Sequence, residues 1–228
     1  MNMITNLFSS FDPCSSSFLL NNWMSITLVF LLFPLPLWLI SNQITLFFQS
    51  SITFLYKELS LLLPNPVSKG RSLFFIRLIL FIIFNNFFGL FPYIFTASSH
   101  LVVSLSLAGP LWLTFLLYGW VINTKHIFAH LVPLSTPTLL MPFIVLIESI
   151  SNLIRPGTLT VRLSANMIAG HLLLTLLGNQ TASSPNFTLL TLLLVTQIIL
   201  LSLEAAVALI QAYVFIILSS LYSGETTL

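Results

Sequence analysis

The sequence contains few charged residues. Its 228 residues include seven Lys and Arg and five Asp and Glu, so 5% are charged, against about 25% in an average soluble domain. A soluble protein needs a charged surface to stay dispersed, whereas 57% of this chain is hydrophobic. A net charge of +2 provides no basic patch for nucleic acid. The composition excludes a soluble enzyme, a disordered tail and a nucleic-acid-binding domain, and it predicts that lipid surrounds most of the chain.

The sequence also has a single cysteine and lacks a common nucleotide-binding motif. Cys14 is the only cysteine, which excludes a disulfide framework and a cysteine-based metal site. No segment of the form G-x-x-x-x-G-K-[ST] occurs, so the chain lacks the loop that commonly holds the phosphates of ATP. We expect no cofactor, no metal and no catalytic nucleotide site in this chain.

Apolar runs of about 20 residues predict helices that cross a membrane. Such runs lie at 23–40, 73–95 and 101–122. The segment 43–63 differs, because its apolar residues recur at helical spacing with polar residues between them, which favours an amphipathic helix lying in the interface. An ordinary connecting loop with some helix is the alternative for 43–63. The expected fold is an all-α, polytopic membrane domain over residues 1–228.

Two apolar segments near the C-terminus are longer than one perpendicular span needs. They cover 138–178 and 187–222, and a polar, turn-rich connector at 179–186 separates them. At 1.5 Å per residue, a helix of about 38 residues reaches roughly 57 Å, against a hydrocarbon core of about 30 Å. Either four short spans or two long, steeply tilted helices fit. No turn cluster lies inside 187–222, so we favour a tilted hairpin, giving about five membrane helices plus one interfacial helix.

The distribution of basic residues predicts the orientation. Lys57, Lys69 and Arg71 lie between the first two spans, and Lys125 follows the third. Because loops rich in Lys and Arg stay on the inner side, we expect the N-terminus outside and the C-terminus inside.

A few ionisable residues lie deep inside apolar sequence, where a charge costs at least about 2.5 kcal/mol and indicates function. These are Glu148, Arg155, Arg162 and Glu204, with His171 as a titratable companion. Residues seven apart share one helix face. The resulting polar stripes are Glu148, Asn152, Arg155, Arg162 and Asn166 on the first long helix, and Gln197, Glu204 and Gln211 on the second.

Structural explanations compete with functional ones at most of these positions. Arg155 could extend toward an interface, and Glu148 could simply neutralise it. His171, predicted to face away from the Arg162 stripe, could be an ordinary buried histidine, and Asn166 and Gln211 could join helices by hydrogen bonds. Arg162 has no acidic residue three or four positions away. A buried guanidinium in that setting requires a water-filled cavity or an acid from another chain.

Three segments resemble subunit a of the F-type ATP synthases. Arg155-Pro-Gly-Thr-Leu-Thr-Val-Arg162-Leu-Ser-Ala-Asn166-Met-Ile-Ala-Gly-His171 resembles the signature helix of that family. Leu203-Glu204-Ala-Ala-Val-Ala-Leu-Ile-Gln211-Ala-Tyr213 is similar to its last helix, and Asn85-Asn-Phe-Phe-Gly-Leu-Phe-Pro92 to an earlier element. Bacterial members typically carry a glutamate at the position of His171 and a histidine at the position of Glu204. The reversed arrangement in this sequence resembles the mitochondrial form of the family.

The resemblance implies a proton-translocating subunit beside a ring of c subunits. Arg162 would attract the ring carboxylates and block leakage between two offset aqueous half-channels. His171 and Glu204 would relay protons on the inlet side, Glu148 would serve the outlet side, and Asn166, Gln211 and Tyr213 would line or orient the path. The expected location is the mitochondrial inner membrane, with the N-terminus facing the intermembrane space and the C-terminus in the matrix.

The resemblance also implies partners: the c-ring, the peripheral-stalk subunit b and small membrane subunits, with ATP chemistry in other subunits. The alternative is another multi-span proton or ion transporter subunit of the respiratory membrane. A haem-binding cytochrome needs facing histidine pairs; of His100, His126, His130 and His171 only one pair has helical spacing, and it lies near a loop. A secondary transporter is expected to show internal repeats, and we find none.

Overall fold

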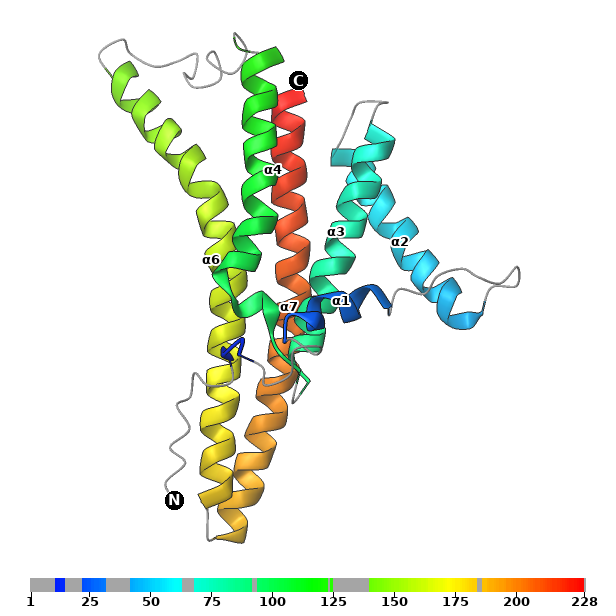
Figure 1. The fold of residues 1–228 in the computed structure, drawn as a ribbon, viewed down its shortest axis with the longest axis vertical. Coiled ribbons are helices and arrows are strands. Elements are labelled where there is room, and N and C mark those ends of the chain that lie inside the picture. The colour runs from blue at the N-terminus through cyan, green and yellow to red at the C-terminus, as the bar shows by residue number, and fades with distance from the viewer. Residues whose placement is uncertain are drawn as a thin grey trace.

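The computed structural model describes residues 11–14, 22–31, 42–62, 68–91, 94–122, 124, 140–183 and 186–227. In these ranges the chain is helical and contains no strand, so the predicted all-α class is confirmed. Figure 1 shows the order of the helices. They are α1 (Met24–Leu31), α2 (Gln43–Leu62), α3 (Ser68–Gly89), the 3₁₀ turn η2 (Ala97–Ser99), α4 (Leu101–Ile122), α6 (Met141–Ser183) and α7 (Phe187–Thr227).

Four of the described helices are long and apolar enough to cross a membrane. The candidate spans are Gly70–Gly89, Leu101–Val121, Met141–Ser183 and Phe187–Gly224, so the chain is a polytopic membrane protein. Of the expected span at 23–40, α1 accounts for Met24–Leu31, and residues 32–40 lie outside the described residues. Helix α2 is not among the candidate spans, and its interfacial position stays a prediction.

The two long helices are continuous. Helix α6 has 43 residues and α7 has 41, and they run antiparallel as the longest feature of the fold (Figure 1). Pro156 lies inside α6 without ending it. The alternative of four short spans is therefore wrong. A helix of 43 residues reaches about 65 Å, so it must either tilt or extend beyond a hydrocarbon core of about 30 Å.

Helix boundaries depart from the expected ranges mainly at α3. It begins at Ser68 and ends at Gly89, earlier at both ends than the range 73–95. Glycine ends helices readily because it has no Cβ to oppose the turn that follows. The early end leaves room for the turn η2 between α3 and α4, and this turn contacts α3, α4 and α6.

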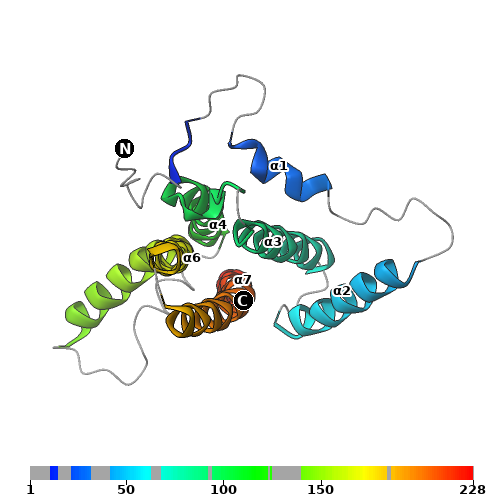
Figure 2. The same ribbon diagram turned by 90° about the horizontal axis from the view of Figure 1, so that it is seen from below.

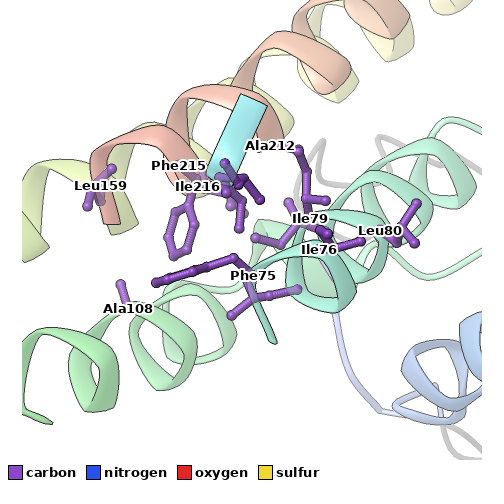
Figure 3. Packing of buried hydrophobic residues seen from close by; sticks show 13 residues of the cluster. Phe75, Ile76, Ile79, Leu80, Ala108, Leu159, Ala212, Phe215 and Ile216 are labelled. Atoms are coloured by element: carbon purple, nitrogen blue, oxygen red, sulfur yellow. The ribbon is translucent and has the colours of Figure 1, made fainter. Parts of the chain in front are cut away.

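Helix α3 is central to the hydrophobic core. Figure 3 shows Phe75, Ile76 and Ile79 of α3 facing Ala212, Phe215 and Ile216 of α7, with Ala108 of α4 and Leu159 of α6 at the edge of the cluster. Ala212 is fully buried, and a side chain this small lets two helices approach closely in lipid. The core thus holds the middle of the α6–α7 hairpin against α3 and α4.

The N-terminal part of α6 leans away from α4 and α7, whereas its remainder packs against them (Figures 1 and 2). Exposed apolar side chains are numerous on this hairpin and include Phe143, Leu153 and Val161 of α6 and Leu192, Ile198 and Leu203 of α7. In water such a surface would drive aggregation. In a membrane it is available to lipid.

Candidate functional site

The polar residues of α7 lie on the side of the helix that is packed inside the protein. Glu204 is 6% exposed and Gln211 is 7% exposed, and Gln197 is half-buried. The intervals of seven residues place them on one face, as predicted. An acidic side chain buried in an apolar helix is costly unless it is paired or neutral, so the surroundings of Glu204 decide what it can do.

Glu204 occupies a space that exists because residue 170 of α6 is glycine. A Cβ added at Gly170 would overlap the carboxyl group of Glu204 and would lie 3.0 Å from its Cγ. Both carboxyl oxygens are buried and have no hydrogen-bond partner within the described ranges. The carboxyl group is therefore packed between α6 and α7 with its polar atoms unpaired, an arrangement that normally requires water.

His171 follows Gly170 and lies near the C-terminal end of α3. Its ring hydrogen-bonds to the backbone of Gly89, and its centroid lies 6.0 Å from that of the Phe11 ring in an edge-on contact. Its Nε2 is buried and has no partner in the described part of the chain. As predicted, His171 faces away from Arg162. In the described part of the chain, no hydrogen bond joins His171 directly to Glu204. The two side chains are connected only through Gly170, which precedes His171 and packs against the Glu204 carboxyl group.

Arg162 lies on an exposed face of α6 together with Asn166. Its backbone carbonyl accepts a long hydrogen bond of 3.5 Å from Nε2 of Gln211, and Leu159, Leu163 and Phe215 line the small cleft beside it. No carboxylate of the described residues forms an ion pair with its guanidinium. The predicted unpaired arginine is present and is directed out of the subunit rather than into it.

Glu148 and Arg155 form an ion pair, which was one of the possibilities that the sequence left open. Nη2 of Arg155 lies 3.7 Å from Oε1 of Glu148, and its guanidinium carbon lies 4.9 Å from the ring centre of Tyr222 on α7. A cation over an aromatic face is attracted to it. Arg155 thus connects Glu148 to α7. It lies on the same face of α6 as Arg162, two helical turns away.

Tyr213 lies apart from the other predicted site residues. Its hydroxyl donates a 3.4 Å hydrogen bond to Oε2 of Glu58 on α2. Nine residues separate it from Glu204, a rotation of about 180° on a helix, so it points to the opposite side of α7. Glu58 was missed by the sequence reasoning. The rarity of acidic residues could have drawn attention to Glu58, since it is one of only five in the sequence.

Among the described residues, no three His, Cys, Asp or Glu side chains come together to hold a metal ion. The site itself contains titratable side chains and the permanently charged guanidinium groups of Arg155 and Arg162. Such a set can carry protons and stabilise a carboxylate.

Replacing Gly170 with alanine is expected to destabilise the packing of α6 against α7. Alanine normally favours a helix over glycine by about 1 kcal/mol, but here the added methyl group must displace the Glu204 carboxyl group, at a typical cost of about 1–3 kcal/mol for an overpacked site. The midpoint temperature of thermal unfolding in detergent should therefore fall. Gly178→Ala is the matched control, because nothing lies within 4 Å of its added Cβ. Equal unfolding temperatures in the two variants would contradict this packing.

Comparison with known proteins gives one consistent result. The family model described as ATP synthase A chain matches residues 19–224. The ATP synthase subunit a of Anopheles quadrimaculatus is 57% identical over 224 residues, which cover 98% of this chain and 99% of that protein. The subunits a of Drosophila yakuba and Aedes aegypti are 57% and 55% identical over 223 and 224 residues, with the same coverage. These matches extend over nearly the whole sequence, and the chain belongs to the ATP synthase A chain family.

Proposed function

We propose that this chain is the proton-translocating stator subunit of a mitochondrial ATP synthase. The observation that carries the proposal is the placement of Arg162. It lies on an exposed face of α6 with no acidic partner among the described residues, at mid-helix in a segment suited to cross a membrane. A permanent charge in that position needs a counter-charge supplied from outside the subunit.

A carboxylate on each c subunit of a rotating ring would supply that counter-charge. Arg162 would attract the carboxylate when it has lost its proton and release it when it gains one. Arginine suits this task because its guanidinium stays protonated in proteins, whereas a lysine can lose its proton when desolvated. The fixed charge would also repel protons and so prevent a direct leak past the ring.

Two offset aqueous half-channels would connect the ring to the two sides of the membrane. Glu204 and His171 would relay protons on the inlet side, since both titrate and both have buried atoms without a protein partner in the described ranges. Gln211 and Asn166 would orient the path beside Arg162. Glu148, held by Arg155, would act on the outlet side. Each proton would supply about 2.3 kcal/mol per 100 mV of membrane potential.

The location and partners follow from the same proposal. The chain would lie in the mitochondrial inner membrane, with its N-terminus toward the intermembrane space and its C-terminus in the matrix, as the basic residues predict. It would contact the c-ring through the exposed face of α6, and the peripheral-stalk subunit b and small membrane subunits elsewhere. Nucleotide chemistry would take place in other subunits of the complex.

A cross-link between α6 and the c-ring tests this function. The native Cys14 is exposed and is first changed to serine. A cysteine at Ala165, which is exposed beside Arg162, should form a disulfide with a cysteine placed next to the ring carboxylate. A cysteine at the adjacent Ser164, which is 3% exposed, is the matched control and should remain unlinked. Equal cross-linking at both positions, or none at Ala165, would overturn the proposed contact.

A further inference from the structure

The buried polar side-chain atoms that lack a hydrogen-bond partner are concentrated in one part of the described structure. They are Ser25 Oγ, both amide atoms of Asn86, Ser98 Oγ, His100 Nε2, His171 Nε2 and both carboxyl oxygens of Glu204. Buried polar atoms in folded proteins are nearly always bonded to protein or to ordered water. Figure 1 shows that α1, the C-terminal end of α3 and the turn before α4 lie at the level of the middle of α6 and α7. Ordered water is the partner that such atoms normally have when protein supplies none.

Contacts connect these residues step by step. Glu204 packs on Gly170, and the neighbouring His171 reaches the backbone of Gly89. A Cβ at Gly89 would lie 3.1 Å from the Cγ2 of Thr96, and Thr96 immediately precedes the turn η2. This turn contains Ser98 and leads to His100. Asn86, which is fully buried, lies one turn before Gly89 on α3. The residues that carry the unpaired atoms thus follow one chain of neighbours from Glu204 through His171 and Gly89 to the turn before α4.

The imidazole of His100 packs with two aromatic side chains, Trp23 and Phe95, which also contact each other at a centroid distance of 5.6 Å. Its ring centroid lies 5.3 Å from that of Trp23 and 5.2 Å from that of Phe95. These contacts restrict the ring, while its Nε2 is buried and unpaired within the described ranges. A structural histidine would be expected to bond both ring nitrogens, directly or through the backbone. An oriented imidazole with a free nitrogen is instead suited to exchange protons with water.

We propose that His100 is a second proton-carrying imidazole, at the outer end of a hydrated path that Asn86 and Ser98 line and that leads past His171 to Glu204. This proposal rests on the proposed function of the chain. His100 accepts a proton from water at Nε2 and, as the imidazolium, releases it from Nε2 to another water beside Ser98. The ring is then neutral again in its first tautomer, so that one proton has moved and no bond between heavy atoms has changed.

The charged and titratable groups around His100 are few. Helices α1 and α4 contain no Asp, Glu, Lys, Arg or His. The basic residues of α3 lie in its first half, away from the end that carries Asn86. Helix α6 contributes His171. Asp12 is exposed, and its backbone carbonyl accepts a 3.3 Å hydrogen bond from Asn22, next to Trp23.

The central experiment measures proton flux through the complete complex in vesicles carrying His100→Gln. Glutamine keeps hydrogen-bonding capacity but cannot carry a proton. We expect flux from the inlet side to fall about tenfold, less than the roughly hundredfold that a positioned proton donor can contribute, because water remains in the path. Unchanged flux would overturn the proposal.

Two matched pairs test the lining of the path and guard against a variant that fails to fold. Ser98 and Ser99 are equally buried, but the Ser99 hydroxyl donates to the Thr96 carbonyl at 2.7 Å. Asn85 donates its amide to the Phe81 carbonyl at 3.1 Å, whereas the amide of the adjacent Asn86 is unpaired. Ser98→Ala and Asn86→Leu should slow flux, and Ser99→Ala and Asn85→Leu should not. The opposite order in both pairs would also overturn the proposal.

The variants His100→Gln and Arg162→Ala together distinguish a wrong role for His100 from a wrong function for the whole chain. If His100 is no relay but the chain translocates protons, His100→Gln behaves as the unmodified complex while Arg162→Ala still abolishes coupling. If the chain does not translocate protons, Arg162→Ala has no effect on coupling, whatever happens at His100.

Discussion

Replacing Arg162 with alanine is expected to abolish proton-driven ATP synthesis. The reason is electrostatic: a guanidinium and a carboxylate 4 Å apart attract by about 4 kcal/mol at an effective dielectric constant of about 20, which corresponds to roughly a thousandfold in rate. Under the proposed function, a ring carboxylate without that charge beside it would then have nothing to stabilise its ionised form at the subunit surface, and protons would leak past it. ATP synthesis is measured in vesicles energised by an imposed proton gradient.

The control for Arg162→Ala is Arg77→Ala. Arg77 is also an exposed arginine in a candidate membrane span, but it lies on α3, away from the exposed face of α6. The control should assemble and support synthesis at a rate close to that of the unmodified complex. Normal synthesis in Arg162→Ala would remove Arg162 from the mechanism and with it the observation on which the proposed function depends. Loss of synthesis in both variants would indicate an assembly defect instead.

Replacing Glu204 with glutamine is expected to slow proton uptake from the inlet side by about a hundredfold, the lower end of what a positioned acid–base group contributes. Glutamine has nearly the same shape, so the packing against Gly170 should persist, but an amide cannot accept and release a proton at neutral pH. Flux is followed with a pH-sensitive dye inside vesicles. Because the change is isosteric, the amount of assembled complex should stay the same.

Glu58→Gln is the matched control for Glu204→Gln. Glu58 is half-buried and accepts the hydrogen bond of Tyr213, on the opposite side of α7 from Glu204. The same chemical change there should leave proton flux intact. A Glu204→Gln complex that conducts as fast as this control would exclude Glu204 from the relay and leave His171 to be tested alone.

The membrane character of the chain and the continuity of its two long helices could be predicted from the sequence. Both depend on local properties: twelve charges cannot cover a soluble surface, and an apolar run without turn residues continues as one helix. The ends of the helices were less predictable. Helix α3 ends at Gly89 rather than near Phe95, because the turn η2 packs between α3, α4 and α6, and this packing involves residues far apart in the sequence.

Seven-residue spacing was sufficient to place Glu204 and Gln211 on one face of α7, and to identify Arg162 as a charge without a partner on its own helix. It could not show what lies opposite that face. Three contacts depend on how separate segments of the chain meet. The carboxyl group of Glu204 rests on Gly170, Tyr213 bonds Glu58 on α2, and His100 packs with Trp23 and Phe95.

The sequence by itself determined which residues are exceptional, because charges are rare in a chain that lipid surrounds, and each one inside an apolar run is costly to place there. It also determined which of them share a helix face, because helical periodicity is a local property. Only the tertiary structure decided which exceptional residues meet. Side-chain packing between the helices leaves Arg162 outside and buries polar atoms of Glu204, His171, Asn86, Ser98 and His100 without a hydrogen-bond partner in the described ranges.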